Sequence, residues 1–356
     1  MKQKTTAFKL LAAAVWGILV CFQAASGQQL QEYRVDYQGK RGPGKGKHLV
    51  FIASDHEYRS EESLPALARI LAKRHGFHCT VLFGLDEQGY ILPGSSNLKG
   101  LEVLENADLL VIFTRFLNLP DEQMRHVDNY LKRGGPVVGF RTATHAFSNL
   151  ENADWAHYSY NYNGPRSAWK NGFGKLILGE TWVSHYGTNH EQASRLVIEK
   201  GQEAHPILRG VSDMFVESGG YTAYPEKMGA TVLARGQVLN GMEPDAPADE
   251  TKELLPVAWV RQYKLENGGS GRVFATTHGA SEDLKNEGFR RMVINACFWA
   301  VGMEKAIKPN NNVDFVGPYQ PTKFSFDGYK ANVRPSDLAG WDSLIMPGEI
   351  VKKKAE

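Results

Sequence analysis

Four groups of polar residues could carry out chemistry, and each follows a short apolar run of the sequence. The groups are Asp55, His56, Glu57 and Arg59; Thr114 and Arg115; Arg141, Thr142 and His145; and His278. Imidazole rings titrate near neutral pH and therefore suit proton transfer. Guanidinium groups hold anions or neighbouring oxygens and stabilise developing negative charge. The combination is typical of general acid–base chemistry on a small polar substrate.

These residue types divide into two predicted roles. The predicted catalytic set is His145, His56, Asp55, Glu57 and His278, in which a carboxylate orients an imidazole. The predicted substrate-binding set is Arg59, Thr114, Arg115, Arg141, Thr142, His185 and Trp182. Each arginine has an alternative role, which is to fix loop carboxylates such as Asp55 and Glu57 by ion pairing.

A metal site is an open alternative for the same residues. His145, His185, His190 and His278, together with Asp55 or Glu57, offer atoms that zinc accepts as ligands. His185 and His190 are separated by a loop and do not show the i, i+4 spacing of a helical ligand pair. A divalent metal such as zinc therefore stays an alternative, and no other cofactor is predicted.

Several classes of protein are excluded by what the sequence lacks. It contains no G-x-S-x-G, no P-loop and no dinucleotide glycine fingerprint after its first strand. The turn after Gly139 holds Phe140, Arg141 and Thr142, so neither Cys nor Ser stands where a nucleophile elbow would place it. The net charge of +2, with both signs interspersed, argues against a nucleic-acid partner. Covalent acyl chemistry at this turn is therefore not expected.

The elements that position these groups alternate regularly along the first half of the chain. Apolar runs at 48–53, 79–83, 107–113 and 137–140 predict strands. Helical periodicity follows the first run up to about His75, and a second helix begins at Pro120. This rhythm predicts an α/β, doubly wound, mostly parallel sheet with helices on both faces. In such a sheet the polar groups emerge at one edge, where ligands bind.

The second half of the chain is less regular. Residues 150–182 mix Tyr and Trp with Asn and Gly, which predicts an irregular, aromatic-rich insertion. Further strands are expected at 195–199, 231–234, 256–260 and 271–277, and a closing helix is expected at 289–301. The last of these strands places His278 directly after its end.

The two termini are expected to lie outside the fold. Residues 1–27 have the positive start, short apolar run and small-residue cleavage site of a signal peptide, which predicts a periplasmic or secreted protein. An uncleaved anchor is the alternative. Residues 28–46 are expected to be a linker and residues 308–356 a polar tail, of which only 313–319 pack on the domain. Cys79 and Cys297 are expected to be buried free thiols.

The chain resembles the ThuA-like (trehalose utilisation) family of the class I glutamine amidotransferase-like superfold, over a domain at 47–307. The resemblance rests on short segments rather than one motif: Leu49-Val50-Phe51-Ile52, Ala107-Asp108-Leu109-Leu110-Val111, Gly134-Gly135-Pro136-Val137-Val138-Gly139, His205-Pro206-Ile207, Pro256-Val257-Ala258-Trp259 and Gly271-Arg272-Val273-Phe274. The strand-end variants around Asp55 and Arg141 resemble an exported bacterial subgroup. Many members carry a histidine two residues after the strand glycine; here that residue is Arg141, and His145 follows four residues on.

The resemblance implies a flavodoxin-like sheet, no amidotransferase cysteine and a role in carbohydrate metabolism. We therefore expect an exported enzyme that acts on a sugar or keto-sugar as an isomerase, lyase or hydrolase, with a small carbohydrate as its partner. Neither a nucleic acid nor a membrane beyond the export signal is expected, and a homo-oligomer stays open. The alternatives are a metal-dependent hydrolase and a non-catalytic carbohydrate-binding module that uses Trp155, Trp169 and Trp182 as stacking surfaces.

Overall fold

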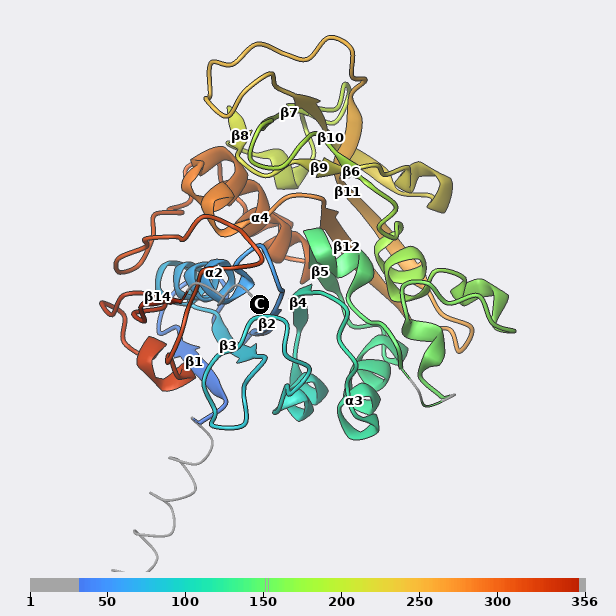
Figure 1. Cartoon of the computed structure of the whole chain (residues 1–356), viewed down its shortest axis with the longest axis vertical. Coiled ribbons are helices and arrows are strands. Elements are labelled where there is room, and N and C mark those ends of the chain that lie inside the picture. Colours follow the sequence, from blue (N-terminus) through green and yellow to red (C-terminus); the bar gives the residue numbers. More distant parts are fainter. Residues whose placement is uncertain (1–31, 151, 153, 352–356) are drawn as a thin grey trace, which may run out of the picture.

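A ten-stranded sheet forms the centre of the molecule (Figure 1). The computed structural model describes residues 32–351 except 151 and 153. The strands run across the sheet in the order β1-β3-β2-β4-β5-β12-β11-β10-β7-β8. Their bounds are β1 (Arg34–Gln38), β2 (His48–Ser54), β3 (His78–Phe83), β4 (Leu109–Thr114), β5 (Val137–Phe140), β7 (Ser194–Ile198), β8 (Met214–Val216), β10 (Thr231–Val238), β11 (Leu255–Lys264) and β12 (Ser270–Thr276).

Five adjacent strands, β3, β2, β4, β5 and β12, are parallel. Their apolar runs are continuous because both faces of the sheet are covered, and Leu49–Ala53 and Leu109–Phe113 are almost fully buried. The chain leaves β2 to reach β3 on one side and later reaches β4 on the other. The carboxyl ends of β2 and β4 therefore lie at a topological switch point, where α/β sheets bind ligands. The predicted α/β, doubly wound, flavodoxin-like fold is confirmed.

The sheet continues beyond β12 with antiparallel strands, which the spacing of the apolar runs does not predict. β11, β10, β7 and β8 each pair antiparallel with their neighbour. For β11 and β12 the reason is the length of their connection: β11 ends at Lys264 and β12 begins at Ser270, and such a short loop cannot cross over to a parallel neighbour. The sheet is therefore parallel at its centre and antiparallel along one flank.

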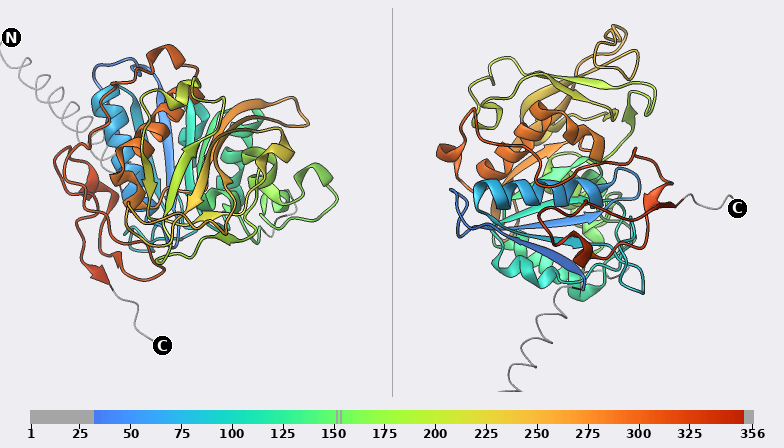
Figure 2. Two further views of the ribbon diagram at one scale, coloured as in Figure 1. Left: turned by 90° about the horizontal axis from the view of Figure 1, so that it is seen from above. Right: turned by 90° about the vertical axis from the view of Figure 1, so that its left-hand side faces the viewer.

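Helices cover both faces of the sheet (Figure 2). Helices α2 (Ser60–His75) and α4 (Glu287–Ala300) share one apolar cluster with one face. Helix α3 (Asp121–Lys132) packs with the other face, together with the insertion. The insertion has only short 3-10 or π turns between 156 and 178, as its irregular sequence predicted. None of the helices in the described ranges is long and apolar enough to cross a membrane.

The segment expected to be a linker contains an edge strand, which corrects that prediction. β1 pairs antiparallel with β3 from Arg34 to Gln38. Tyr37 on this strand is buried and donates a hydrogen bond to the carbonyl of Leu338 at 2.7 Å. The alternation of exposed and buried residues is too short to stand out in a polar sequence. The predicted signal peptide at 1–27 lies outside the described residues.

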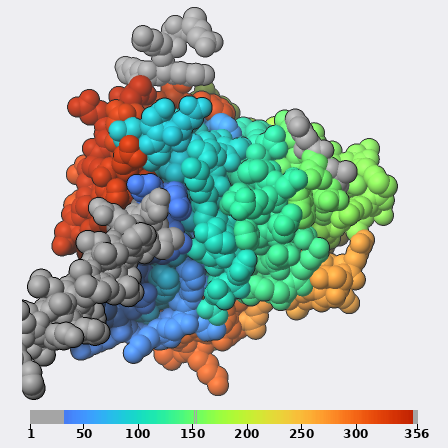
Figure 3. All heavy atoms as spheres, turned by 90° about the horizontal axis from the view of Figure 1, so that it is seen from below, coloured from blue at the N-terminus to red at the C-terminus, as the bar shows by residue number. Residues whose placement is uncertain are grey.

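The carboxyl-terminal segment is also part of the fold rather than a loose tail, which corrects the second prediction about the termini. It buries apolar residues well beyond 319, among them Phe324, Val333 and Leu338. Arg69 of α2 holds it through hydrogen bonds to the carbonyls of Leu338 and Ser343, at 2.9 and 2.7 Å. Figure 3 shows this red segment beside the blue and cyan amino-terminal half. Polar anchoring without apolar periodicity explains why the sequence pattern did not reveal it. Residues 352–356 lie outside the described residues.

Candidate functional site

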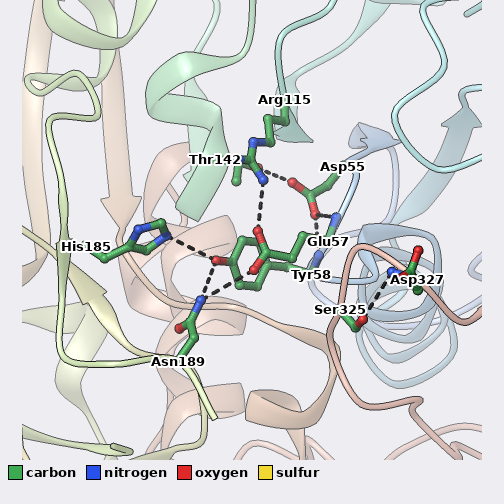
Figure 4. A network of polar contacts seen from close by, with 9 residues as sticks. All are labelled: Asp55, Glu57, Tyr58, Arg115, Thr142, His185, Asn189, Ser325 and Asp327. Carbon is green, nitrogen blue, oxygen red and sulfur yellow. Dashed lines mark hydrogen bonds and ion pairs between the residues drawn. The ribbon is translucent and has the colours of Figure 1, made fainter. Parts of the chain in front are cut away.

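The polar groups that follow the parallel strands meet at one edge of the sheet, as predicted (Figure 4). Thr142, after β5, donates a hydrogen bond to Asp55, after β2, at 2.7 Å. Arg115, after β4, forms an ion pair with Glu57 at 2.9 Å. Direct contacts thus join the ends of three strands, and His278 follows the fourth.

Asp55 organises the turn that carries the other groups. Its carboxylate accepts hydrogen bonds from the backbone amides of Glu57, at 2.7 Å, and Tyr58, in addition to the Thr142 hydroxyl. Its own backbone amide donates a hydrogen bond to the hydroxyl oxygen of Ser60 at 3.0 Å. The side chain is fully buried. A carboxylate with three donors fixes the local backbone of the turn.

A second set of contacts joins Glu57, Arg115 and Tyr58 to the loop that carries Asn189 and His185. Asn189 donates to the Tyr58 hydroxyl at 2.9 Å and approaches Glu57 at 3.4 Å. His185 Nε2 lies 3.5 Å from the same hydroxyl. The Arg115 guanidinium is partly exposed and also faces the rings of Phe116 and Phe326. Arg115 is therefore the arginine best placed to meet an incoming anion or carbonyl oxygen.

His145 lies among aromatic rings at the same edge. The centroids of Phe116, Trp182 and Tyr221 are 5.0, 5.6 and 5.9 Å from that of its ring. Burial lowers the pKa of His145 well below its usual value, and the charges of Arg115 and Arg141 lower it further. Nδ1 lies 3.1 Å from the Thr144 hydroxyl. Within the described part of the chain Nε2 has no hydrogen-bond partner, so a neutral imidazole with a free acceptor is available at neutral pH.

Arg141 occupies the elbow after β5 but faces inward. Its φ of 42° lies in the left-handed region, which gives the sharp strand-to-helix turn typical of a nucleophile elbow. The guanidinium is fully buried and donates to the carbonyls of Gly219, at 2.5 Å, and Thr277, at 2.8 Å. It stacks on Tyr58, with 3.7 Å between its central carbon and the ring centroid, and on Tyr221, at 4.7 Å. These contacts give Arg141 a positioning role: it joins β5, β12 and the loop before Tyr221.

His278 is enclosed beneath this arginine. Its Nδ1 lies 3.2 Å from the Ser218 hydroxyl, which donates to Asp283 at 2.6 Å. Asp283 thus contacts the serine and not the imidazole, and all of these side chains are buried. The arrangement is therefore not a Ser-His-Asp triad, in which the carboxylate orients the histidine. Burial, followed by the charge of Arg141, lowers the pKa of His278 to about 3.

This buried imidazole predicts a specific pH dependence of stability. Between pH 6.5 and about 3 the unfolded chain binds a proton at His278 that the native protein does not, so stability falls as the pH falls. We expect His278→Gln to remove up to about 1.4 kcal/mol per pH unit from the slope of unfolding free energy between pH 4 and 6. Urea titrations of both proteins measure it. Equal slopes would show that His278 is protonated in the folded state.

The remaining predicted residues are divided between the site and its surroundings. The ring of His56 lies against Gly94, where an added Cβ would come within 2.3 Å of it. Burial lowers the pKa of His56, while Asp55 opposes this shift. His185 and Trp182 stand on the insertion side, 5.8 Å apart. Thr114 is buried, and Arg59 points away to the carbonyl of Asp327. Arg59 thus anchors the carboxyl-terminal segment rather than lining the site.

The geometry does not support the metal alternative. Between residues 32 and 351, leaving aside 151 and 153, no three His, Cys, Asp or Glu side chains come together as a metal site requires. His190 instead stacks on Phe324 with centroids 4.3 Å apart, and His278 is enclosed. The residues that the alternative needed are therefore spread over separate contacts.

The predicted stacking surface is divided as well. Trp155 and Trp169 line a pocket of about 390 Å³ with Asp128, Lys132 and Arg166. Since Lys132 ends α3, just before the start of β5, this pocket lies toward the opposite edge of the sheet from Asp55. Trp182 stands beside His145 instead. The three tryptophans therefore do not form one binding face.

Several residues of the site had no signal in the sequence. Asn189 and Ser218 come from irregular loops and Tyr221 from a two-residue strand, and all three reach the sheet edge only in three dimensions. Tyr58 belongs to the polar turn after β2, but its aromatic type did not suggest a hydroxyl held by His185 and Asn189. The short strands β6 (His185–Tyr186) and β9 (Gly220–Tyr221) pair with each other and bring these loops together.

A mostly parallel sheet with a strained elbow after β5, occupied by Arg141 rather than by Cys or Ser, defines a doubly wound α/β protein with no nucleophile at this elbow. The chain belongs to the ThuA family, described as trehalose utilisation, whose sequence model matches residues 47–300. Membership connects the chain with carbohydrate utilisation. The match also ends before the carboxyl-terminal segment that covers α2.

Two solved structures are similar to this chain at low sequence identity. A ThuA-like protein of Bacteroides uniformis has 16% identity and a TM-score of 0.45, over 77% of this chain and 98% of that one. A ThuA-like protein of Parabacteroides merdae has 16% identity and a TM-score of 0.43, over 78% and 96%. No functionally curated protein matches the sequence. The family assignment therefore rests on the sequence model.

Proposed function

We propose that the protein is an exported enzyme that acts on a sugar already oxidised to a ketone, by proton abstraction next to the carbonyl. The observation that carries this proposal is the unpartnered Nε2 of a neutral, buried His145 in the same site as the Arg115–Glu57 pair. A base that stays neutral and an adjacent cation are what enolate formation requires. Family membership supports a carbohydrate as the substrate.

The proposed reaction divides the work between the residues at the sheet edge. His145 takes the proton from the carbon beside the ketone. The electron pair of that C–H bond forms the carbon–carbon double bond of an enolate, and the π electrons of the carbonyl group move onto its oxygen. Arg115 stabilises the negative charge that develops there. Where the deprotonated carbon carries a hydroxyl, the proton of that hydroxyl moves to the enolate oxygen, a new carbonyl forms there, and return of the abstracted proton to the former carbonyl carbon gives the isomeric ketone. Alternatively, the enolate reforms the ketone and breaks the carbon–oxygen bond at the next carbon, the β-carbon. This step is a β-elimination, and the departing oxygen takes up the proton that His145 removed. Neither route needs an oxidant, because the substrate brings its own ketone.

The proposal of export rests on the sequence of residues 1–27. A positive start, an apolar run and small residues before Gln28 are typical of a cleaved signal. A site with these groups would then act on sugars in the periplasm or outside the cell. Fractionation of cells that produce the full chain tests this location.

Deuterium exchange tests the proposed reaction directly. We expect the protein in D₂O to introduce deuterium beside the ketone of a singly oxidised trehalose, visible by NMR, or to release the β-substituent, visible by mass spectrometry. Arg115→Met should slow this reaction about 10²-fold, as loss of one stabilising donor does. Arg272→Met, which changes a partly exposed arginine paired with Glu304, is the control. Neither exchange nor elimination with any keto-sugar in a panel of mono- and disaccharides would overturn the proposal.

A further inference from the structure

The carboxyl-terminal segment does more than cover α2, because residues 324–327 reach the turn after β2. The amide of Ser325 donates to the carbonyl of Glu57 at 2.8 Å. The amide of Phe324 donates to Glu282 at 3.0 Å, and the carbonyl of Asp327 accepts from Arg59. Figure 4 shows Ser325 and Asp327 next to the site network. This short stretch is therefore held at both ends against the catalytic turn.

Phe326 lies between these anchors and faces outward. Phe324 is fully buried, whereas 62% of Phe326 is exposed. Its ring centroid lies 5.0 Å from the guanidinium carbon of Arg115, and the ring of Phe116 lies 5.2 Å from the same carbon. An exposed aromatic ring gains little stability from the fold. Its position is nevertheless fixed by its neighbours, so a flat apolar surface stands beside the arginine of the site.

We propose that Phe326 forms a stacking subsite for a second sugar ring, next to the ring held by Arg115. This inference rests on the proposed function and deepens it. The sugar ring that reacts lies between His145 and Arg115. The second ring of the disaccharide lays its flat apolar face on the ring of Phe326, and this contact removes apolar surface of both rings from water. The protein then prefers a disaccharide over a single ring.

The position of this subsite in the chain has a consequence for specificity. Phe326 lies outside residues 47–300, to which the family model matches, whereas the groups proposed to react lie inside that range. The carboxyl-terminal segment thus supplies substrate preference to a site whose chemistry comes from the sheet. Anchoring through backbone atoms of Ser325 and Asp327 leaves the side chain at 326 free to determine that preference.

Calorimetric titration of the full chain tests the subsite. The probes are trehalose oxidised to a ketone on one ring, and methyl glucoside oxidised in the same way. We expect Phe326→Ala to raise the Kd for the two-ring probe about tenfold and to leave the Kd for the one-ring probe unchanged. Phe326→Trp should restore tight binding of the two-ring probe. A general loss of folding would weaken both probes, so the split between them separates stacking from damage.

Val197→Ala serves as the control, because Val197 is also exposed, at 46%, but lies on β7 in the antiparallel flank. It should change neither Kd. Equal weakening of both probes by Phe326→Ala, or no weakening of either, would overturn the subsite while leaving the proposed function intact. If the unaltered protein binds neither keto-sugar, the proposed function fails, and the subsite fails with it.

Discussion

Replacement of His145 by glutamine is expected to lower kcat for a keto-sugar by about 10²–10⁴-fold, the usual contribution of a general base. The glutamine fills a similar space and keeps a polar group near Thr144, but it cannot accept a proton. KM should change little, because substrate binding is assigned to Arg115 and its neighbours. Initial rates of product formation, measured by mass spectrometry, give both constants.

The acid limb of the pH–rate profile provides a second readout for the same residue. Since burial and the nearby arginines hold the pKa of His145 well below its usual value, the base form persists into mildly acidic solution. We expect kcat/KM to stay constant as the pH falls through 6.5 and to decline only at lower pH. A decline centred near 6.5 would assign the base to a histidine in ordinary surroundings.

His126→Gln is a matched control for this experiment. His126 lies on α3, outside the proposed site, and its Nδ1 is 3.3 Å from the carboxylate of Glu105. It should retain the kcat of the unaltered protein. Normal turnover by His145→Gln would remove the base assignment and transfer it to His56, a half-buried imidazole that also lies near Arg115.

The convergence of polar groups could be predicted because it depends on topology alone. Once the runs that end at Ser54, Thr114 and Phe140 are recognised as parallel strands, their following residues must share one edge. How deeply each side chain is buried could not be predicted from the topology. Arg115 and Arg141 both follow strands, yet one is partly exposed and the other fully buried. That difference depends on the loop before Tyr221, which has no periodic pattern.

The carboxyl-terminal segment shows a second limit of the sequence pattern. Its contacts join residues far apart in the chain, such as Arg69 with Leu338 and Glu57 with Ser325. Many of them end on backbone carbonyls or amides, which any residue type provides. A polar, proline-bearing sequence therefore looks the same whether it is loose or anchored. Only the arginines and glutamates of α2 and of the turn before it could indicate that another segment is anchored there. The same residues are equally typical of a helix exposed to solvent.

Replacement of Arg141 by alanine is expected to lower the free energy of unfolding by about 3–5 kcal/mol, as removal of one partner from a buried polar network does. The change leaves the carbonyls of Gly219 and Thr277 without their donor and empties the space between Tyr58 and Tyr221. Chemical denaturation monitored by tryptophan fluorescence measures the loss. Arg272→Ala, at a partly exposed ion pair, should cost less than about 1 kcal/mol.

Arg141→Lys separates the positioning role of this arginine from a role in binding. Lysine keeps the positive charge, but it has no planar group to stack between the two tyrosines. It therefore cannot replace both the stacking and the hydrogen bonds to the carbonyls of Gly219 and Thr277. If Arg141 positions the sheet edge, the lysine variant should lose stability and activity together, because the turn that holds His145 moves with the elbow. A lysine variant with full stability but no turnover would instead show that Arg141 contacts the substrate. The elbow would then supply an anion-binding group directly, at the place where a nucleophile stands in an amidotransferase.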